Sequence, residues 1–243
     1  MLAPDQVDID NVVPIPTLGQ NFDKKVYPAL TVSTKSRVLG EAAGKSWESG
    51  PEDLTAEIRR QVEVAHGMAC YYCGYLSTDN EVDNLNDNHR DVTLPNLRPV
   101  CVVCHAWKHL GELDSAAANL AYLPGLSPQD VNHLQRTIAV ALNGSDDSAR
   151  KDAQALLTWL ASHRQYVAGS WTTYDQGVFA NAIQRANPER LAKQAPLVFE
   201  GLAVVLNAKG LAHQVKGWRK EGYARYPEGQ WARVYHNIMN API

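Results

Sequence analysis

The chain has 243 residues, of which 45% are hydrophobic and 20% charged, and its formal net charge at pH 7 is −3. This is the composition of an ordinary globular protein, with enough residues for one large or two small domains. No apolar run approaches the length of about eighteen residues that a membrane-spanning helix requires, and Met1–Gln20 lacks the pattern of an export signal. The sequence therefore predicts a cytoplasmic protein without direct membrane insertion.

Two elements are expected before the first motif. Residues 1–50 are rich in proline, glycine and small polar residues, with a strand-like run at Tyr27–Val32, which predicts a strand-and-loop region. Pro51, followed by two acidic residues near the positive end of the helix dipole, predicts the start of a helix that Gly67 ends. Its apolar face is expected to contain Leu54, Ile58, Val62 and Ala65.

All four cysteines of the chain lie in two Cys-x-x-Cys pairs. The first is Cys70-Tyr71-Tyr72-Cys73, with Gly74 after it, and the second is Cys101-Val102-Val103-Cys104, with His105 after it. Two such pairs can place four thiolates at the corners of a tetrahedron, the geometry of structural Zn²⁺ sites. Four protein ligands leave no open position for water, which predicts one structural zinc ion rather than a catalytic metal. The predicted ligands are Cys70, Cys73, Cys101 and Cys104.

Three other uses of the cysteines are disfavoured. Cys101–His105 matches a c-type haem attachment pattern, but that chemistry requires export. A thioredoxin-like redox pair would need a strand–helix–strand context, which is missing here. Disulfides would need an oxidising compartment.

The segment between the cysteine pairs predicts a small hairpin. Glu81–Leu97 alternates apolar and polar residues, as expected for two short strands and a loop, and His105–Leu110 is expected to be helical. This order of elements resembles an HNH-type treble-clef nuclease domain. Asp83 and Asn84 stand where that domain has its catalytic histidine. Asparagine cannot accept a proton near neutral pH and aspartate is a poor substitute, so we predict no catalytic residue and no enzyme activity.

Three histidines lie close to this segment. His89 falls in a polar loop and is expected to face solvent. His105 and His109 are one helical turn apart, so they are expected to pack against the cysteine pair or to face solvent, with a nuclease-type metal pair as the alternative. Arg60–Leu110 contains four basic and six acidic residues, a net charge of −2, to which four thiolates and Zn²⁺ would add −2. Such a module opposes binding to phosphates.

A helical region is predicted over residues 113–190. After a turn at Tyr122–Leu126, Ser127-Pro128 followed by Asp130 predicts a capped helix that Asn143-Gly144 ends. A second helix is expected over Asp147–Val167, antiparallel to the first. A third is expected over Asp175–Ala186.

Residues 191–243 are predicted to form a basic, aromatic extension. Leu197–Leu206 is nearly continuous apolar sequence, either a strand or a buried helix, and Gln230–Met239 is expected to be helical. Leu211–His236 carries five basic and two acidic residues, a net charge of +3. It also contains Trp218, Tyr223, Tyr226, Trp231 and Tyr235. We expect these rings in a core or protein interface, and stacking on bases is the alternative.

The predicted fold class is therefore α+β, an HNH-like treble-clef zinc module over residues 51–112 with a mainly helical C-terminal extension. Residues 57–183 resemble the IcmJ/DotN family, a zinc-binding component of the coupling complex in type IVB (Dot/Icm) secretion and conjugation systems. The resemblance rests on both cysteine pairs, Glu81–Leu85 with Asn96-Leu97, and Tyr122–Ser127 leading into the next helix. It does not extend to Leu197–Ile243.

The resemblance implies an HNH-like fold without the catalytic histidine, consistent with Asn84. It also implies a non-enzymatic adaptor that docks on the C-terminal extension of a VirD4-like coupling ATPase, beside small adaptor proteins, and helps recruit substrates. Its location would be cytoplasmic, peripheral to an inner-membrane complex. The alternative is an HNH-type metal-dependent nuclease or nucleic-acid-binding zinc protein; the acidic module and the missing base disfavour it.

Overall fold

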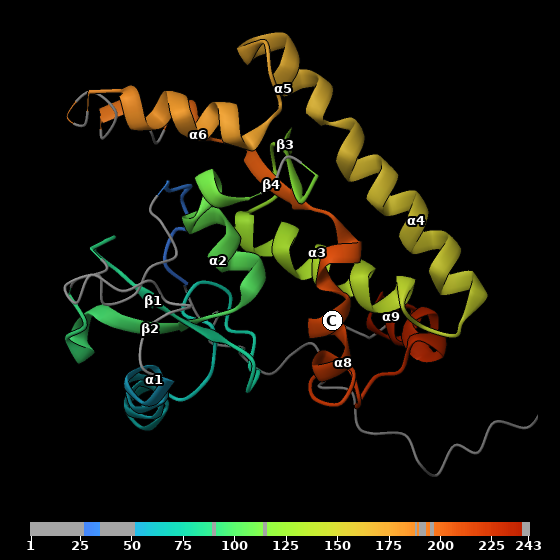
Figure 1. The fold of residues 1–243 in the computed structure, drawn as a ribbon. Coiled ribbons are helices and arrows are strands. Elements are labelled where there is room, and N and C mark those ends of the chain that lie inside the picture. Colours follow the sequence, from blue (N-terminus) through green and yellow to red (C-terminus); the bar gives the residue numbers. More distant parts are fainter. Residues whose placement is uncertain are drawn as a thin grey trace, which may run out of the picture.

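The computed structural model describes residues 27–34, 52–88, 91–113, 116–187, 189, 193–194 and 197–239. Helices and two small antiparallel sheets make up this part of the chain, so the prediction of a mixed helix-and-strand protein is confirmed (Figure 1). The strands are β1 (Glu81–Asn84), β2 (Leu97–Val100), β3 (Ala118–Tyr122) and β4 (Leu202–Leu206). The helices are α1 (Glu52–His66), α2 (Val102–Lys108), α3 (Pro128–Leu142), α4 (Asp147–Ser162), α5 (Arg164–Trp171), α6 (Gln176–Arg185), α8 (Ala212–Trp218) and α9 (Trp231–Met239).

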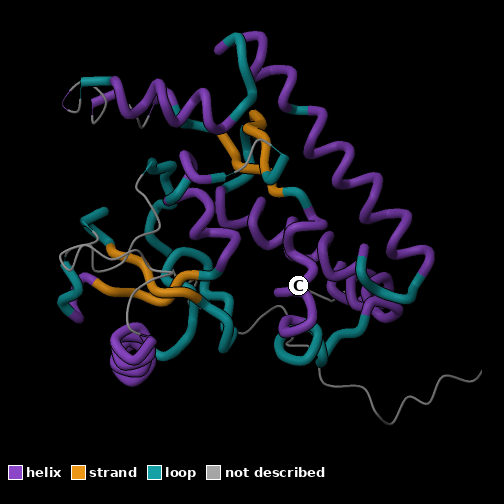
Figure 2. The backbone as a smooth tube through the Cα atoms, in the orientation of Figure 1, coloured by secondary structure: helices purple, strands orange, loops and turns teal. Residues whose placement is uncertain are grey.

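The first sheet is the predicted hairpin of β1 and β2, which pair with Glu81 opposite Val100 and Asn84 opposite Leu97. Helix α1 packs beside this hairpin and α2 follows it (Figures 1 and 2). Gly67 ends α1 with φ +66°, a conformation that a residue without a Cβ adopts readily. A small apolar cluster joins helix to hairpin through Ile58, Val62, Val82 and Leu97. Ala65, expected on this face, is exposed.

The second sheet pairs β3 with β4, which lie about eighty residues apart in the sequence, with Ala118 opposite Leu206 and Tyr122 opposite Leu202. All five residues of β4 are buried, which explains the continuous apolar run there. Strand β3 was not predicted. Its burial does not alternate regularly, so the sequence carries little period-2 pattern.

Helices α3 and α4 form the predicted adjacent pair. The Ser127 hydroxyl accepts from the Asp130 amide, and the Asp130 side chain accepts from the Ser127 amide, a complete capping box. The second helix was predicted to run unbroken over Asp147–Val167, but the structure divides it at His163 into α4 and α5. At this break the His163 carbonyl accepts from the Tyr122 amide of β3 (3.3 Å), and the Ser162 hydroxyl donates to the Trp159 carbonyl (2.7 Å).

A single large apolar core joins the cysteine pairs to the later helices and to the C-terminal segment. Trp218 of α8 is only 1% exposed, and its ring lies 6.1 Å from that of Tyr75, just after the first cysteine pair. The aromatic residues Trp218 and Tyr223 therefore pack in or against the core. Within the described residues, no helix is long and apolar enough to cross a bilayer.

Candidate metal centre

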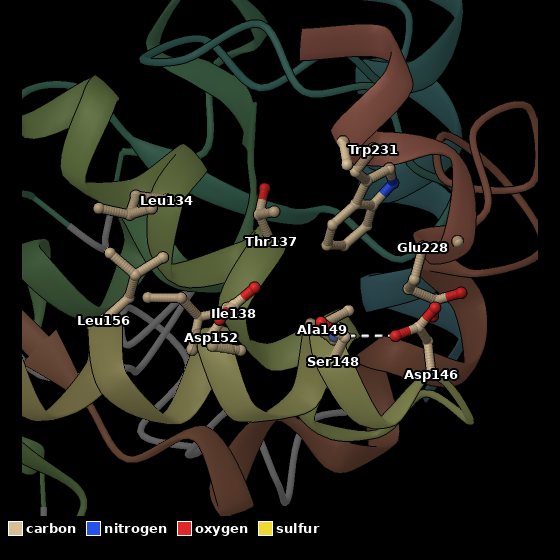
Figure 3. Close-up of a pocket in the computed structure, with 14 residues that line it drawn as sticks. Leu134, Thr137, Ile138, Asp146, Ser148, Ala149, Asp152, Leu156, Glu228 and Trp231 are labelled. Atoms are coloured by element: carbon tan, nitrogen blue, oxygen red, sulfur yellow. Dashed lines mark hydrogen bonds between the residues drawn. The ribbon is translucent and has the colours of Figure 1, made fainter. Parts of the chain in front are cut away.

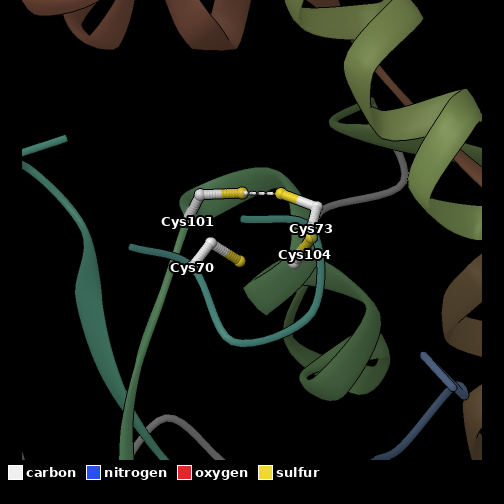
Figure 4. A group of neighbouring side chains, drawn as sticks. All are labelled: Cys70, Cys73, Cys101 and Cys104. Carbon is white, nitrogen blue, oxygen red and sulfur yellow. Dashed lines mark hydrogen bonds between the residues drawn. The ribbon is translucent and has the colours of Figure 1, made fainter. Parts of the chain in front are cut away.

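The four cysteines converge on one point (Figure 4). Their side chains are at most 3% exposed, and their sulfur atoms all lie within 4.8 Å of one another. Backbone bonds shape the first pair: the Cys70 amide donates to the Tyr75 carbonyl (2.9 Å) and the Gly74 amide to the Cys70 carbonyl (2.7 Å). In the second pair, Cys101 is the N-cap of α2 and Cys104 lies in its first turn.

The spacing of the sulfur atoms fits a tetrahedral metal site. The Sγ atoms of Cys73 and Cys101 are 3.7 Å apart. Metal–sulfur bonds of about 2.3 Å in a tetrahedron place the sulfurs about 3.8 Å apart, whereas a disulfide requires about 2.0 Å. All four cysteines are free. The cluster could therefore hold one metal ion with four protein ligands.

Helix α3 supplies a second layer of buried polar groups around the sulfurs. The Arg136 guanidinium, 0% exposed, donates to Cys101 Sγ at 3.0 Å and approaches Cys73 Sγ at 3.7 Å. Asn132 donates to Cys104 Sγ at 3.3 Å and accepts from the Trp107 indole at 3.0 Å. Such outer contacts orient ligands and tune their basicity.

Electrostatics at the cluster favour the ionised form of Cys101, whereas hydrogen bonds among the cysteines raise the pKa of Cys70 and of Cys104. Burial opposes ionisation of Cys101, but hydrogen bonds from the other three cysteines and the charge of Arg136 hold its pKa well below the ordinary value. Burial likewise disfavours the charged form of Arg136, yet the neighbouring Cys101 and Cys73 thiolates raise its pKa. Four thiolates around a divalent ion carry a charge of −2, and Arg136 neutralises part of it.

The guanidinium is also enclosed by aromatic rings. It lies 3.9 Å from the centroid of Tyr75 and 5.5 Å from that of Trp218. A cation over ring faces in a desolvated site is stabilised by about 2 kcal/mol. The C-terminal segment therefore helps to hold the residue that contacts the cysteine sulfurs.

A second group of possible ligands lies at the hairpin. Asp83 of β1, His105 of α2 and His109 are all buried, with one ligand atom of each within 4.8 Å of the others. The Nε2 atoms of the two histidines are 2.9 Å apart, and His105 Nε2 is 3.6 Å from Asp83 Oδ1. The Glu81 carboxylate contacts His105 Nδ1. Burial would lower the pKa of His105, but hydrogen bonds to Asp83 and Glu81 raise it above 6.5.

The histidines and the asparagine near the hairpin were the other candidate site residues. His105 and His109 do not face solvent; they meet Asp83, as the alternative of a metal pair requires. Asn84 is 1% exposed and its amide donates to the Asp91 carbonyl (2.8 Å). His89 lies outside the described residues.

Sequence reasoning missed Asn132 and Arg136. The pattern that could have revealed them is a set of polar residues, Asn132, Gln135 and Arg136, on the face of α3 that also carries Val131 and Ile138. Polar groups at core positions need partners, and here the partners are the cysteine sulfurs and the β4 backbone, which Gln135 contacts.

Comparison with known proteins identifies no family: no family model matches the chain, and no curated protein matches it.

Proposed function

We propose that this protein is a non-enzymatic docking subunit, stabilised by one zinc ion, in a coupling complex of the type IVB secretion or conjugation kind. It would dock on the C-terminal extension of a VirD4-like coupling ATPase, beside small adaptor proteins, and help recruit substrates at the cytoplasmic side of the inner membrane. The observation that carries the proposal is the closed four-cysteine cluster bonded to α3 through Asn132 and Arg136.

This arrangement suits a docking role for a physical reason. Zinc sites of this type contribute about 10–16 kcal/mol of apparent binding free energy, which is available for folding. The cluster holds the hairpin, α3 and, through Trp218, the C-terminal segment in one packed unit. A rigid surface loses little conformational entropy when a flexible partner binds.

An HNH-like treble clef is the fold that we propose for this unit. A cysteine pair, the β1–β2 hairpin, a second cysteine pair and α2 occur in the order that such a fold requires. Asn84 on β1 supplies no proton acceptor. The absence of a base at this position supports binding rather than hydrolysis.

Affinity purification from the native host, with mass spectrometry of the bound proteins, tests the proposal. We expect a VirD4-like ATPase with small adaptors, and we expect Cys101→Ser, which removes one metal ligand, to lose them. Recovery of nucleic acid with no secretion component would refute the proposal.

The Asp83–His105–His109 group supports a second candidate, a metal-dependent HNH nuclease. Carboxylate and imidazole ligands suit several divalent ions, and an ion held by them could activate a water molecule for hydrolysis. A plasmid-nicking assay with Mg²⁺ or Mn²⁺ decides between the two. The docking proposal expects no nicking by the wild type; nicking that Asp83→Asn and His105→Ala abolish would establish the nuclease. The Asn84→His variant places a base at this position. Nicking by this variant would show that the site holds a metal ion in a productive position.

A further inference from the structure

A groove lies on the side of α3 and α4 that faces the C-terminal segment (Figure 3). Its volume is about 460 Å³, within the range of ligand-binding pockets. The walls are mostly apolar: Leu134 and Ile138 come from α3, Leu156 from α4 and Trp231 from the start of α9. Leu156 is 42% exposed, so the groove presents apolar surface to solvent. Exposed apolar surface in a concave site is typical of a binding surface.

Acidic side chains line the groove. Asp146 and Asp152 come from the start of α4 and Glu228 from the opposite wall, and Figure 3 shows the Asp146 and Glu228 carboxylates at the same end. None of the described residues that line the groove is lysine, arginine or histidine. Arg219, outside the lining, pairs with Glu228 at 3.1 Å. Glu228 is paired in this way, and the Asp146 and Asp152 carboxylates keep the lining acidic, so a positively charged occupant is favoured.

Hydrogen bonds within the protein fix two of the side chains that line the groove, Trp231 and Asp146. The Trp231 indole donates to the Tyr226 carbonyl (2.8 Å), which fixes its ring across from Thr137. Asp146 accepts from the Ala149 amide (2.8 Å) as the N-cap of α4. A ligand would therefore find its apolar and acidic walls already in place, and little binding energy would be spent on ordering them.

We propose that this groove binds a basic amphipathic peptide segment of a partner protein. The segment would place a large apolar side chain between Leu134, Leu156 and Trp231 and a lysine or arginine against Asp152 or Asp146. This deepens the docking function proposed above and rests on it, because the partner of the docking subunit would carry the segment. The recognition is that of an amphipathic helix in a groove.

Fluorescence anisotropy with the full-length, metal-loaded protein tests the proposal. The probe is a fluorescein-labelled peptide of about fourteen residues with leucines at helical spacing and lysines beside them, and the control peptide carries glutamate in place of lysine. We expect binding of the lysine peptide alone. Asp152→Lys should weaken it about tenfold, since an attraction becomes a repulsion, and Leu156→Ser should weaken it by a similar factor.

Glu63→Lys is the matched control, because it makes the same change of charge at an exposed position of α1, away from the groove. It should leave the affinity unchanged. Equal binding of the two peptides, no binding of either, or equal loss in Glu63→Lys would overturn the proposal. So would a wild-type dimer that Leu156→Ser converts to a monomer, because the groove would then be a contact between two copies of this chain.

The same variants in the native-host purification separate the two proposals. If wild type recovers the coupling ATPase and Asp152→Lys does not, both stand. Recovery by both proteins overturns the groove as the docking site while the docking function stands. Recovery by neither overturns the docking function, and the anisotropy result then decides whether the groove binds such peptides at all.

Discussion

Replacing Arg136 with methionine tests whether a buried cation holds the metal centre together. The guanidinium is fully buried, donates to Cys101 Sγ at 3.0 Å and lies 3.9 Å from the Tyr75 ring centroid. Methionine has an unbranched, apolar side chain somewhat shorter than that of arginine. It therefore fills most of the space but cannot donate a hydrogen bond. The substitution therefore removes the charge and leaves most of the packing.

The expected loss in the free energy of unfolding comes from the charge that Arg136 leaves without a partner. Removing one partner of a buried charged pair costs about 3–5 kcal/mol, because the other charge stays buried without compensation. Here the remaining charge is that of the thiolates. Loss of an outer contact to metal ligands weakens metal affinity by about 10- to 100-fold. We therefore expect Arg136→Met to lower the free energy of unfolding by about 3–5 kcal/mol and to release zinc more readily.

Urea unfolding of the metal-loaded protein, followed by tryptophan fluorescence, measures the first effect, and competition with a chromophoric chelator measures the second. Arg150→Met on α4 is the matched control. Arg150 is half-exposed and pairs with Asp147 at the surface, so its loss should cost less than about 1 kcal/mol. Arg136→Lys keeps the charge without the planar fork and should be intermediate.

The reasoning would be refuted by an Arg136→Met protein that unfolds within about 1 kcal/mol of the wild type and competes equally with the chelator. In that case the thiolates would not need the guanidinium, and its burial would reflect packing on Tyr75 and Trp218 alone.

Further predictions concern the surroundings of the two clusters. Trp218→Ala should lower the free energy of unfolding in urea by about 3–5 kcal/mol, because it empties a site that is 1% exposed; an unchanged midpoint would place the C-terminal segment outside the folded unit. Asn132→Leu should cost about 1–3 kcal/mol in the same assay and weaken zinc binding, since it strands the Trp107 indole N–H; an unaltered chelator competition would contradict the contact to Cys104. His105→Gln tests the pH dependence. Burial lowers the pKa of His105, but Asp83 and Glu81 raise it above 6.5 overall, so its contribution to stability is complete below pH 6.5 and is lost as the pH rises through the raised pKa. Urea midpoints of both proteins from pH 5 to 8 measure this (about the range of histidine titration); a difference that grows with pH would instead indicate a metal ion on neutral His105.

Local signals in the sequence were sufficient for the elements that depend on neighbouring residues. The capping box at Ser127 and Asp130, the end of α1 at Gly67 and the hairpin between the cysteine pairs were predicted and are present. Each is decided by hydrogen bonds or backbone conformations within a few residues, or by strands that are consecutive in the chain. The gathering of four cysteines was likewise predictable, because the two pairs flank that hairpin.

Contacts between distant segments were beyond such reasoning. Strand β3 pairs with the distant β4, and the helix breaks between α4 and α5 at His163, whose carbonyl accepts a hydrogen bond from the Tyr122 amide of β3. Whether His105 and His109 would face solvent or each other depended on where α2 packs against β1. These outcomes are set by tertiary hydrogen bonds and burial, which leave no periodic trace in the sequence.

For this protein, the sequence by itself determined which four cysteines could bind a metal ion and the lack of a histidine at Asp83-Asn84, since both depend on which residue types occur at which spacing. Only the tertiary structure decided that Arg136 and Asn132 contact the sulfurs, that Asp83 meets two histidines and that Trp218 encloses the guanidinium. The physical reason is that a buried charge or polar group must find its partners in space, and those partners come from whichever segments the core brings together.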